Sequence, residues 1–267
     1  MRGHNLWLHV MAVAAGIALL YLGIGRMGST VAYLNDQELS NGNLIRAGVW
    51  EESSNLVLDL EFDKGGGTTA DDSSPYNNDG TIFGASWIEE PSGPGWALSF
   101  DGTDDYVQVS DSPTLQVTDA LTMEAWMNLT PRADGNDQSL LMKGAYDWYL
   151  GVWGTERTPS GIIEFFAGDD VGGWHGLAGS TSVDDGQWHH VATTYDGSKI
   201  RVYVDGAIDG ETATSFTFKT STDDLLISKG GGRWVQGDVD RVRVYNRALS
   251  PSEVQQSYNE SVSHYIP

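Results

Sequence analysis

Apolar and polar residues alternate in short runs through most of the chain. Every second residue from Leu56 to Phe62 is apolar, and Ile200, Val202 and Val204 alternate with polar neighbours. A period of two with one apolar face is typical of antiparallel strands that are packed on one side. Asp-Gly pairs favour tight hairpins because both central turn positions need a positive φ. They stand at residues 79–80, 101–102, 134–135, 185–186, 196–197, 205–206 and 209–210. The pattern predicts an all-β fold of antiparallel sheets.

Helical signals are confined to the two ends of the chain. Near the C-terminus, Ser250-Pro251-Ser252-Glu253 is a capping box with proline at the first helical position. We expect a short helix from there to about Tyr258. At the N-terminus, Leu6–Gly25 is almost wholly apolar, a length between that of a signal-peptide core and that of a membrane span. We therefore expect an N-terminal apolar helix that serves as a signal peptide or as a membrane anchor.

The segment after this apolar run carries a processing signal. Thr30-Val31-Ala32 offers small residues for cleavage just before Tyr33. The stretch Ser29–Gly48 resembles the start of proteins of the TasA and camelysin type, and that resemblance implies cleavage after Ala32. The residues in register are Thr30, Ala32, Tyr33, Asp36, Glu38, Ser40, Gly42, Asn43, Ala47 and Gly48. The alternative is an uncleaved anchor followed by a polar linker. We therefore assign residues 1–32 to a signal peptide or anchor, and residues 33–54 to a polar segment that is a possible donor strand or linker.

Five later segments carry a second resemblance. They are Leu56–Ile82, Ala97–Val109, Leu121–Leu129, Gly186–Gly206 and Trp234–Val254. In this order and spacing they resemble the laminin G-like, concanavalin A-like jelly-roll domains. The resemblance implies a two-sheet antiparallel jelly-roll sandwich over residues 55–262. A sandwich core needs bulk at its inward positions, and we expect Trp126 and Trp188 to supply it.

The net charge of the chain limits the classes of molecule that it can bind. There are 37 acidic residues against 15 basic ones, a net charge of −22, which argues against nucleic acid or an anionic membrane as a partner. We expect membrane contact only through the N-terminal helix, if it is uncleaved. The acids are 25 Asp and 12 Glu, and only five of the basic residues are Lys, which is typical of proteins adapted to brine. The alternative is an acidic secreted protein with several cation sites. Cysteine is absent, so the extracellular or cell-surface location that we expect rests on the N-terminus.

A calcium site is implied by the jelly-roll resemblance. Calcium takes about six to eight oxygen ligands from carboxylates, carbonyls and water. In many relatives a cation links the opening strands to the final strand, and the matching positions here are Asp240, the carbonyl of Gly102 and, beside it, Asp101. Arg241 stands where the family commonly has Glu, and an arginine there could neutralise the site. The alternative is that these acids belong to a generally acidic surface.

A ligand site is expected among aromatic residues of the glycine-rich region 144–176. The candidates are Trp148, Tyr149, Trp153 and Trp174. Aromatic faces beside polar side chains are what a sugar ring stacks on and hydrogen-bonds to. The alternative is that Trp148 and Trp153 fill strands of the concave sheet or its rim.

Catalytic motifs are not found in the sequence. Laminarinase-type hydrolases of this fold carry E-x-D-x-E or E-x-D-x-x-E on one strand, which places two carboxyl groups about 5 Å apart. Glu124 and Glu164 each stand alone, and no nucleophile elbow, zinc motif or phosphate loop is present. We expect a protein that is not an enzyme.

Three functions fit these observations. The first is a non-catalytic adhesion or carbohydrate-binding module, calcium-stabilised and salt-adapted, whose partner is a glycan or a cell-surface or matrix protein. The second is a subunit of an extracellular filament or matrix that self-assembles into fibres when the N-terminal segment is donated as a strand. The third is a glycan-active enzyme with an unfamiliar pattern. Asn128 and Asn259 lie in sequons that permit N-glycosylation.

Overall fold

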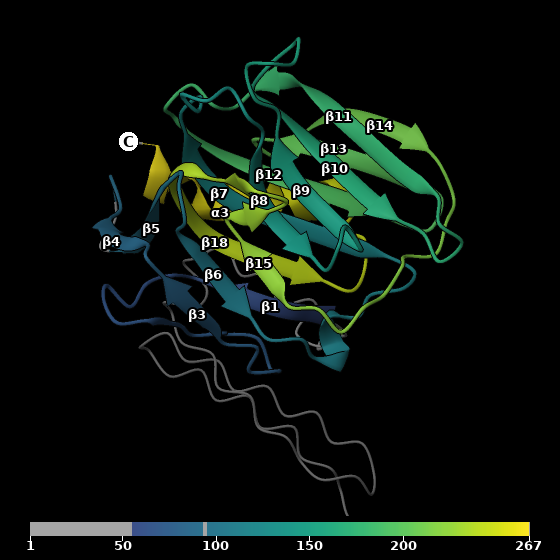
Figure 1. The fold of residues 1–267 in the computed structure, drawn as a ribbon, viewed down its shortest axis with the longest axis horizontal. Coiled ribbons are helices and arrows are strands. Elements are labelled where there is room, and N and C mark those ends of the chain that lie inside the picture. The colour runs from purple at the N-terminus through teal and green to yellow at the C-terminus, as the bar shows by residue number, and fades with distance from the viewer. Residues whose placement is uncertain (1–54, 93–94, 267) are drawn as a thin grey trace, which may run out of the picture. The chain divides into compact units, whose positions relative to one another are not determined.

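The computed structural model describes residues 55–92 and 95–266. The expected signal or anchor (1–32) and donor strand or linker (33–54) lie outside the described residues, so cleavage and strand donation stay predictions. Within the described part, no helix is long and apolar enough to cross a membrane. Two large antiparallel sheets and a C-terminal helix dominate this part (Figure 1), which confirms the predicted all-β sandwich.

The first sheet follows the order β14-β13-β12-β7-β18-β5-β4. Strand β1 also belongs to it and pairs with the second half of β18, whose first half pairs with β5. Its strands are β14 (Ala207–Ala213), β13 (Lys199–Val204), β12 (Trp188–Tyr195), β7 (Leu121–Leu129), β18 (Gln236–Tyr245), β5 (Trp96–Asp101), β4 (Ser86–Glu89) and β1 (Leu56–Leu60). The first and last strands of the domain therefore lie side by side, as a jelly roll requires.

The second sheet follows the order β11-β10-β9-β8-β15-β6-β3-β2. Its strands are β11 (Trp174–Ser182), β10 (Ile162–Gly168), β9 (Trp148–Val152), β8 (Gln138–Lys143), β15 (Leu225–Ile227), β6 (Tyr106–Val109), β3 (Gly80–Phe83) and β2 (Thr69–Ala70). A single-turn 3-10 helix, η1 (Pro113–Leu115), follows β6. The edge strands β11 and β14 meet (Figure 1), and Asp209 of β14 accepts hydrogen bonds from Ser180 and Thr181 of β11. These bonds hold the two sheets together at that edge.

The hydrophobic core lies between the two sheets. Strand β7 illustrates how the alternating pattern builds this core. Its alternate residues Met123, Ala125 and Met127 point inward and have no exposed surface. Side chains of β9, β10 and β15 on the opposite sheet complete the core, among them Trp148 and Phe165. Their burial supplies most of the driving force for folding.

The outer face of the first sheet is covered by helix α3 (Pro251–Tyr265). Trp126 stacks on Tyr265 with ring centroids 4.1 Å apart, and its indole N–H donates to the hydroxyl of Ser261 at 2.9 Å. Trp188 also packs on Tyr265, at 5.0 Å. The prediction that Trp126 and Trp188 fill the sandwich core was therefore wrong: they form a separate cluster beneath the helix.

The turn and capping predictions were confirmed in part. Ser250 caps α3 together with Glu253, as the capping box predicts, but the helix continues seven residues beyond Tyr258. The Asp205-Gly206 turn joins β13 to β14 with both residues at positive φ (50° and 75°). The Asp209-Gly210 pair instead lies inside β14, because Asp209 is engaged by the β11 edge.

Candidate functional site

Strands β9 and β10 present alternate side chains to opposite faces of the second sheet. Trp148 and Phe165 belong to the core, whereas Tyr149, Glu164 and Phe166 project from the outer face. Tyr149 lies directly opposite Phe166 in the antiparallel pairing of the two strands. The outer face therefore carries two aromatic rings and a carboxylate side by side.

Tyr146 connects these rings into an aromatic cluster. It precedes β9 and adopts a positive φ of 63°. Its ring meets Tyr149, Phe166 and Trp174 edge to face, with centroids 5.6, 5.8 and 6.3 Å away. Trp174 stacks on Phe166 at 5.2 Å and keeps 57% of its surface exposed. The cluster offers apolar ring surface to a ligand at one edge of the sheet.

A short hairpin supplies a wall above the second sheet. It consists of β16 (Lys229–Gly230) and β17 (Arg233–Trp234) and packs on β8. Arg233 donates from Nη1 to the hydroxyl of Tyr146 at 2.7 Å. Gly231 sits at the tip with a φ of 58°, and a Cβ there would lie 2.8 Å from that hydroxyl. Glycine is thus required for the hairpin to approach the aromatic cluster.

The opposite wall is formed by Arg157 and its partners. The guanidinium of Arg157 lies over the ring of Trp153, 4.8 Å from its centroid. It donates to the Asp137 carboxylate at 2.7 Å and approaches Glu164 at 3.8 Å. The Asp137 carboxylate also faces Arg233, at 3.4 Å from its Nε. Asp137 therefore joins the two arginine walls.

These walls flank an open cavity of about 310 Å³. Its lining residues are Tyr146, Tyr149, Arg157, Glu164, Phe166 and Arg233. Burial raises the pKa of Glu164, although the N–H of Trp153 and the charge of Arg157 counter part of that rise. Burial also raises the pKa of Tyr149, so its hydroxyl stays protonated and donates to the Gln138 carbonyl at 3.3 Å. The cavity combines apolar ring faces with hydrogen-bond donors and hydrogen-bond acceptors.

The four aromatic residues predicted as ligand contacts have different positions. The prediction that Trp148 contacts a ligand was wrong, because its side chain points inward and has no exposed surface. Tyr149 lines the cavity and Trp174 stacks on its lining residue Phe166. Trp153 supports Arg157 from behind. Three of the four thus surround one site, which the glycine-rich region 144–176 largely builds.

Sequence reasoning missed five lining residues: Tyr146, Arg157, Glu164, Phe166 and Arg233. Glu164 and Phe166 alternate with core residues in Ile162–Gly168, and this alternation is a signal that could have placed both on an outer face. No comparable signal marks Arg233, because only the folded hairpin brings it near Tyr146.

The three residues predicted to bind calcium are not brought together. Asp101 pairs with Gln236, four residues before Asp240 along β18, which separates the two acids by about 13 Å. The carbonyl of Gly102 accepts from Arg132 at 2.6 Å. Asp240 is buried beneath α3, where its carboxylate accepts from the Tyr265 hydroxyl at 2.7 Å. Asp240 is thus wrong as a partner of Asp101.

Asp101 instead gathers with two other acids of the same turn. Carboxylate oxygens of Asp101, Asp104 and Asp105 all lie within 4.8 Å of one another. Burial raises the pKa of Asp105, and the charges of Asp101 and Asp104 raise it further, against a hydrogen bond from the Asp101 N–H that lowers it. Clustered carboxylates are the ligands that calcium prefers, so these residues fit a calcium ion.

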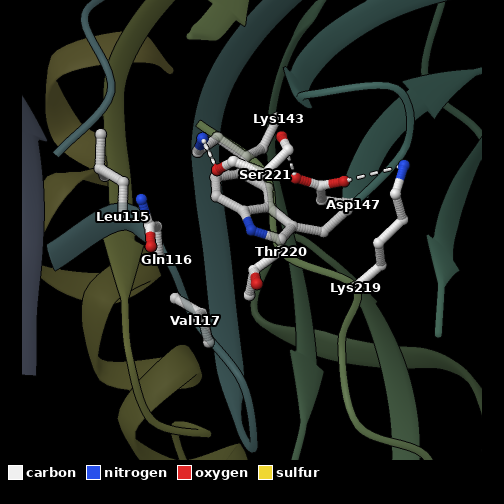
Figure 2. Close-up of a pocket in the computed structure, with 9 residues that line it drawn as sticks. Leu115, Gln116, Val117, Lys143, Asp147, Lys219, Thr220 and Ser221 are labelled. Carbon is white, nitrogen blue, oxygen red and sulfur yellow. Dashed lines mark hydrogen bonds and ion pairs between the residues drawn. The ribbon is translucent and has the colours of Figure 1, made fainter. Parts of the chain in front are cut away.

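A second crevice lies near η1 and the start of β9 (Figure 2). Its buried Lys143 pairs with Asp111 at 2.8 Å and donates to the carbonyl of Ser221 at 3.2 Å. Ser221 in turn donates to Asp147, which also faces Lys219 at 3.5 Å. The side chains leave no room for a water molecule. This polar network therefore ties loops together rather than receiving a ligand.

Known proteins match the β-sandwich in sequence. Residues 101–255 match the laminin G family described as the concanavalin A-like lectin/glucanases superfamily. Pappalysin-1 of Mus musculus is 30% identical over 137 residues, which are 46% of this chain and 8% of that protein. The mouse sushi, von Willebrand factor type A, EGF and pentraxin domain-containing protein 1 is 27% identical over 191 residues, 62% of this chain and 5% of that protein. The chain thus spans a small part of either relative.

Solved structures share the fold at lower identity. The binding domain of Paraclostridial Mosquitocidal Protein 1 has a TM-score of 0.63 at 14% identity, covering 78% of this chain and 52% of that one. The botulinum neurotoxin serotype D ligand-binding domain in complex with N-acetylneuraminic acid has 0.60 at 13%, covering 79% and 52%. Domain 4 of AbnA, an extracellular arabinanase from Geobacillus stearothermophilus, in complex with arabinotriose, has 0.59 at 17%, covering 76% and 97%. These likenesses show a shared fold, and the match over residues 101–255 shows that the chain belongs to the concanavalin A-like lectin/glucanases superfamily and carries a laminin G-like domain.

Proposed function

We propose that this protein is an extracellular, non-catalytic module that binds a glycan in the cavity on the outer face of the second sheet. The observation that carries the proposal is the composition of that cavity. The rings of Tyr146 and Phe166 lie beside Glu164 and two arginines around about 310 Å³ of space. Sugar rings bind by stacking apolar C–H faces on aromatic rings while their hydroxyls exchange hydrogen bonds with polar groups.

The relatives support a binding role. Two of the solved structures with this fold hold a sugar, N-acetylneuraminic acid in one and arabinotriose in the other. Several are receptor-binding domains of toxins. The matching parts of the mouse relatives are small fractions of much larger proteins. A domain that binds a glycan or a surface protein is consistent with all of these relatives. The ligand of each relative is a property of that relative alone.

The cavity favours binding over cleavage. Among its described lining residues, Glu164 is the only carboxylate. Retaining hydrolysis needs a second carboxyl group about 5 Å away and free to attack. The nearby Asp137 is instead held by the guanidinium of Arg157 at 2.7 Å. We therefore assign the domain no catalytic step.

Calcium is a finer part of the proposal. The turn with Asp101, Asp104 and Asp105 would supply carboxylate oxygens, and a bound ion would relieve the repulsion among these three acids. The ion would hold the turn between β5 and β6, at one end of both sheets. We assign it a stabilising role there and no contact with the sugar.

The test is binding of purified protein to a glycan array, followed by calorimetry on the glycans that bind. Trp174→Ala and Phe166→Ala should each weaken binding about tenfold or more, because each removes aromatic surface from the site. Phe83→Ala is the matched control, since Phe83 is an exposed ring that projects from β3 on the same sheet. Glycans recovered after long incubation should be uncleaved by mass spectrometry. Binding that Trp174→Ala and Phe166→Ala leave unchanged would show that the site lies elsewhere.

A further inference from the structure

The two cations of the cavity are already engaged by protein groups. Arg233 donates to the Tyr146 hydroxyl at 2.7 Å and faces Asp137 at 3.4 Å. Arg157 donates to Asp137 at 2.7 Å, stacks on Trp153 and approaches Glu164. Each guanidinium therefore already pairs with the Asp137 carboxylate, which weakens its attraction for a carboxylate or sulfate of a ligand.

Glu164 is the least engaged charged group of the cavity. Its side chain keeps 21% of its surface exposed, and its ion pair with Arg157 is 3.8 Å long, beyond the range of a hydrogen bond. Burial raises the pKa of this carboxyl, because a half-buried carboxylate loses part of its hydration. An ionised carboxylate in this position can accept hydrogen bonds from a bound ligand. A ligand that supplies hydroxyl groups would satisfy it.

The charges around the cavity sum to zero. Arg157 and Arg233 are balanced by Asp137 and Glu164. The rest of the chain carries a large acidic excess, with a net charge of −22. An anionic ligand would therefore be repelled during its approach and would then meet Glu164 beside two arginines whose charge Asp137 already partly neutralises.

We propose that the cavity selects neutral sugars and rejects acidic ones, with Glu164 accepting two neighbouring hydroxyl groups of the sugar while the ring lies against the aromatic cluster. This inference rests on the proposed glycan binding and names its ligand class. Glu164 is its specificity-determining residue. Sialic acids and uronic acids are excluded because they bring a carboxylate where the cavity needs a hydrogen-bond donor.

The experiment compares matched neutral and acidic sugars by calorimetry at pH 7. Arabinotriose and lactose are the neutral probes, and 3′-sialyllactose is the acidic partner of lactose. At least one neutral probe should bind the parent protein about tenfold more tightly than 3′-sialyllactose. Glu164→Gln should weaken that neutral binding about tenfold, because an amide replaces a charged acceptor. The same variant should narrow the gap between lactose and 3′-sialyllactose.

Glu156→Gln is the matched control. Glu156 is exposed and lies on the loop between β9 and β10, one residue before Arg157. Glu156→Gln removes the same unit of negative charge as Glu164→Gln but at a position outside the cavity lining. It should therefore leave the selectivity for neutral sugars unchanged. Thermal melts of both variants establish that each is folded.

Two outcomes would overturn the inference. One is tighter binding of 3′-sialyllactose than of lactose and arabinotriose. The other is neutral-sugar binding that Glu164→Gln leaves at the parent level. In both cases glycan binding that depends on Phe166 would stand, and only the ligand class would be wrong. Failure of every sugar to bind would instead refute the proposed function itself.

Discussion

Arg233 donates a hydrogen bond of 2.7 Å to the hydroxyl of Tyr146, and this bond joins the β16–β17 hairpin to the loop before β9. The two residues are far apart in the sequence and belong to different parts of the fold. Their contact closes one side of the cavity and orients the tyrosine ring against Phe166. The shape of the site thus depends on a bond between two elements that lie outside the strand pairing of the second sheet.

Tyr146→Phe should weaken glycan binding about threefold to tenfold, since it removes the acceptor of the Arg233 guanidinium. The fold should be unchanged, because the phenylalanine ring keeps the packing of Tyr146 against Tyr149 and Phe166. Calorimetry with the tightest glycan from the array measures the effect. Tyr106→Phe is the control: Tyr106 projects from the same sheet, and its ring packs between Phe83 and Lys229. Equal losses in both variants would contradict the role of the Arg233–Tyr146 bond.

Ser261→Ala should destabilise the protein by about 1–3 kcal/mol, because it leaves the buried indole N–H of Trp126 without its acceptor. Ser263, exposed on the same helix, provides the control variant Ser263→Ala, which should stay within about 0.5 kcal/mol of the parent. Urea unfolding measures both. Glycan affinity should stay at the parent value, because α3 covers the first sheet and the cavity lies on the second. A loss of affinity in Ser261→Ala would mean that the two faces are coupled.

Asp240 should make the protein less stable as the pH rises. Burial raises the pKa of Asp240 well above its usual value, the charge of Glu90 adds to this, and the hydrogen bond from Tyr265 opposes it. The folded state therefore holds a proton that the unfolded chain releases near pH 3.9. The resulting stability is complete below that pH and is lost as the pH rises through the folded pKa.

Asp240→Asn should remove this dependence while it keeps an acceptor for the Tyr265 hydroxyl. The melting temperature of the variant relative to the parent should rise between pH 4 and pH 8. Asp170→Asn, at an exposed position, should show a constant difference over the same range. A parent and an Asp240→Asn variant whose melting temperatures run parallel with pH would contradict the assignment.

Calcium should raise the melting temperature at fixed ionic strength, and chelation should lower it. An ion that binds only the folded state at about a hundredfold excess over Kd stabilises by about 2.7 kcal/mol. Asp104→Asn should reduce this response, because Asp104 is an exposed member of the acidic turn. Asp170→Asn controls for the loss of one surface charge, and magnesium should act more weakly than calcium. If Asp104→Asn responds like the parent, the turn is merely a solvated acidic surface.

Salt should stabilise the domain strongly. With a net charge of −22 the folded chain repels itself, and the Debye length falls to about 3 Å near 1 M salt. Thermal melts in 0.1 M and 2 M potassium chloride decide whether the acidic composition reflects salt adaptation, which predicts the higher midpoint at 2 M. A midpoint at 0.1 M that equals or exceeds it would refute salt adaptation.

The all-β class followed from sequence because its signals are local, whereas the two-sheet jelly roll followed from the resemblance of the five segments. The alternation in Leu56–Leu60 and Lys199–Val204 and the turn at Asp205-Gly206 each predict structure from neighbouring residues. The same logic failed for β7, where residues on both faces are buried and alternation cannot tell the core from the face beneath α3. The helix α3 was predicted to end too early, at about Tyr258. The residues beyond that point include the polar Ser261, whose burial the sequence pattern does not indicate.

The candidate site followed from sequence less well because it depends on register. A shift of four residues along β18 separates Asp101 from Asp240, and nothing local in the sequence sets that pairing. Tyr149 and Trp174 were singled out because aromatic residues are conspicuous in a glycine-rich region, and the structure places both beside the cavity, while their contact with a ligand stays a prediction. The contact between Arg233 and Tyr146 required the folded position of the hairpin.

The β16–β17 hairpin has a consequence for how such a module diversifies. It places Arg233 against the cavity, yet it belongs to neither large sheet. Arg233 can therefore change without disturbing the strand registers that hold the domain together, provided that Gly230, Gly231 and Gly232 are kept. Recombinant libraries that vary residue 233 should yield folded proteins with altered sugar preferences, so that this scaffold can be adapted to new ligands much as an antibody is adapted through its loops.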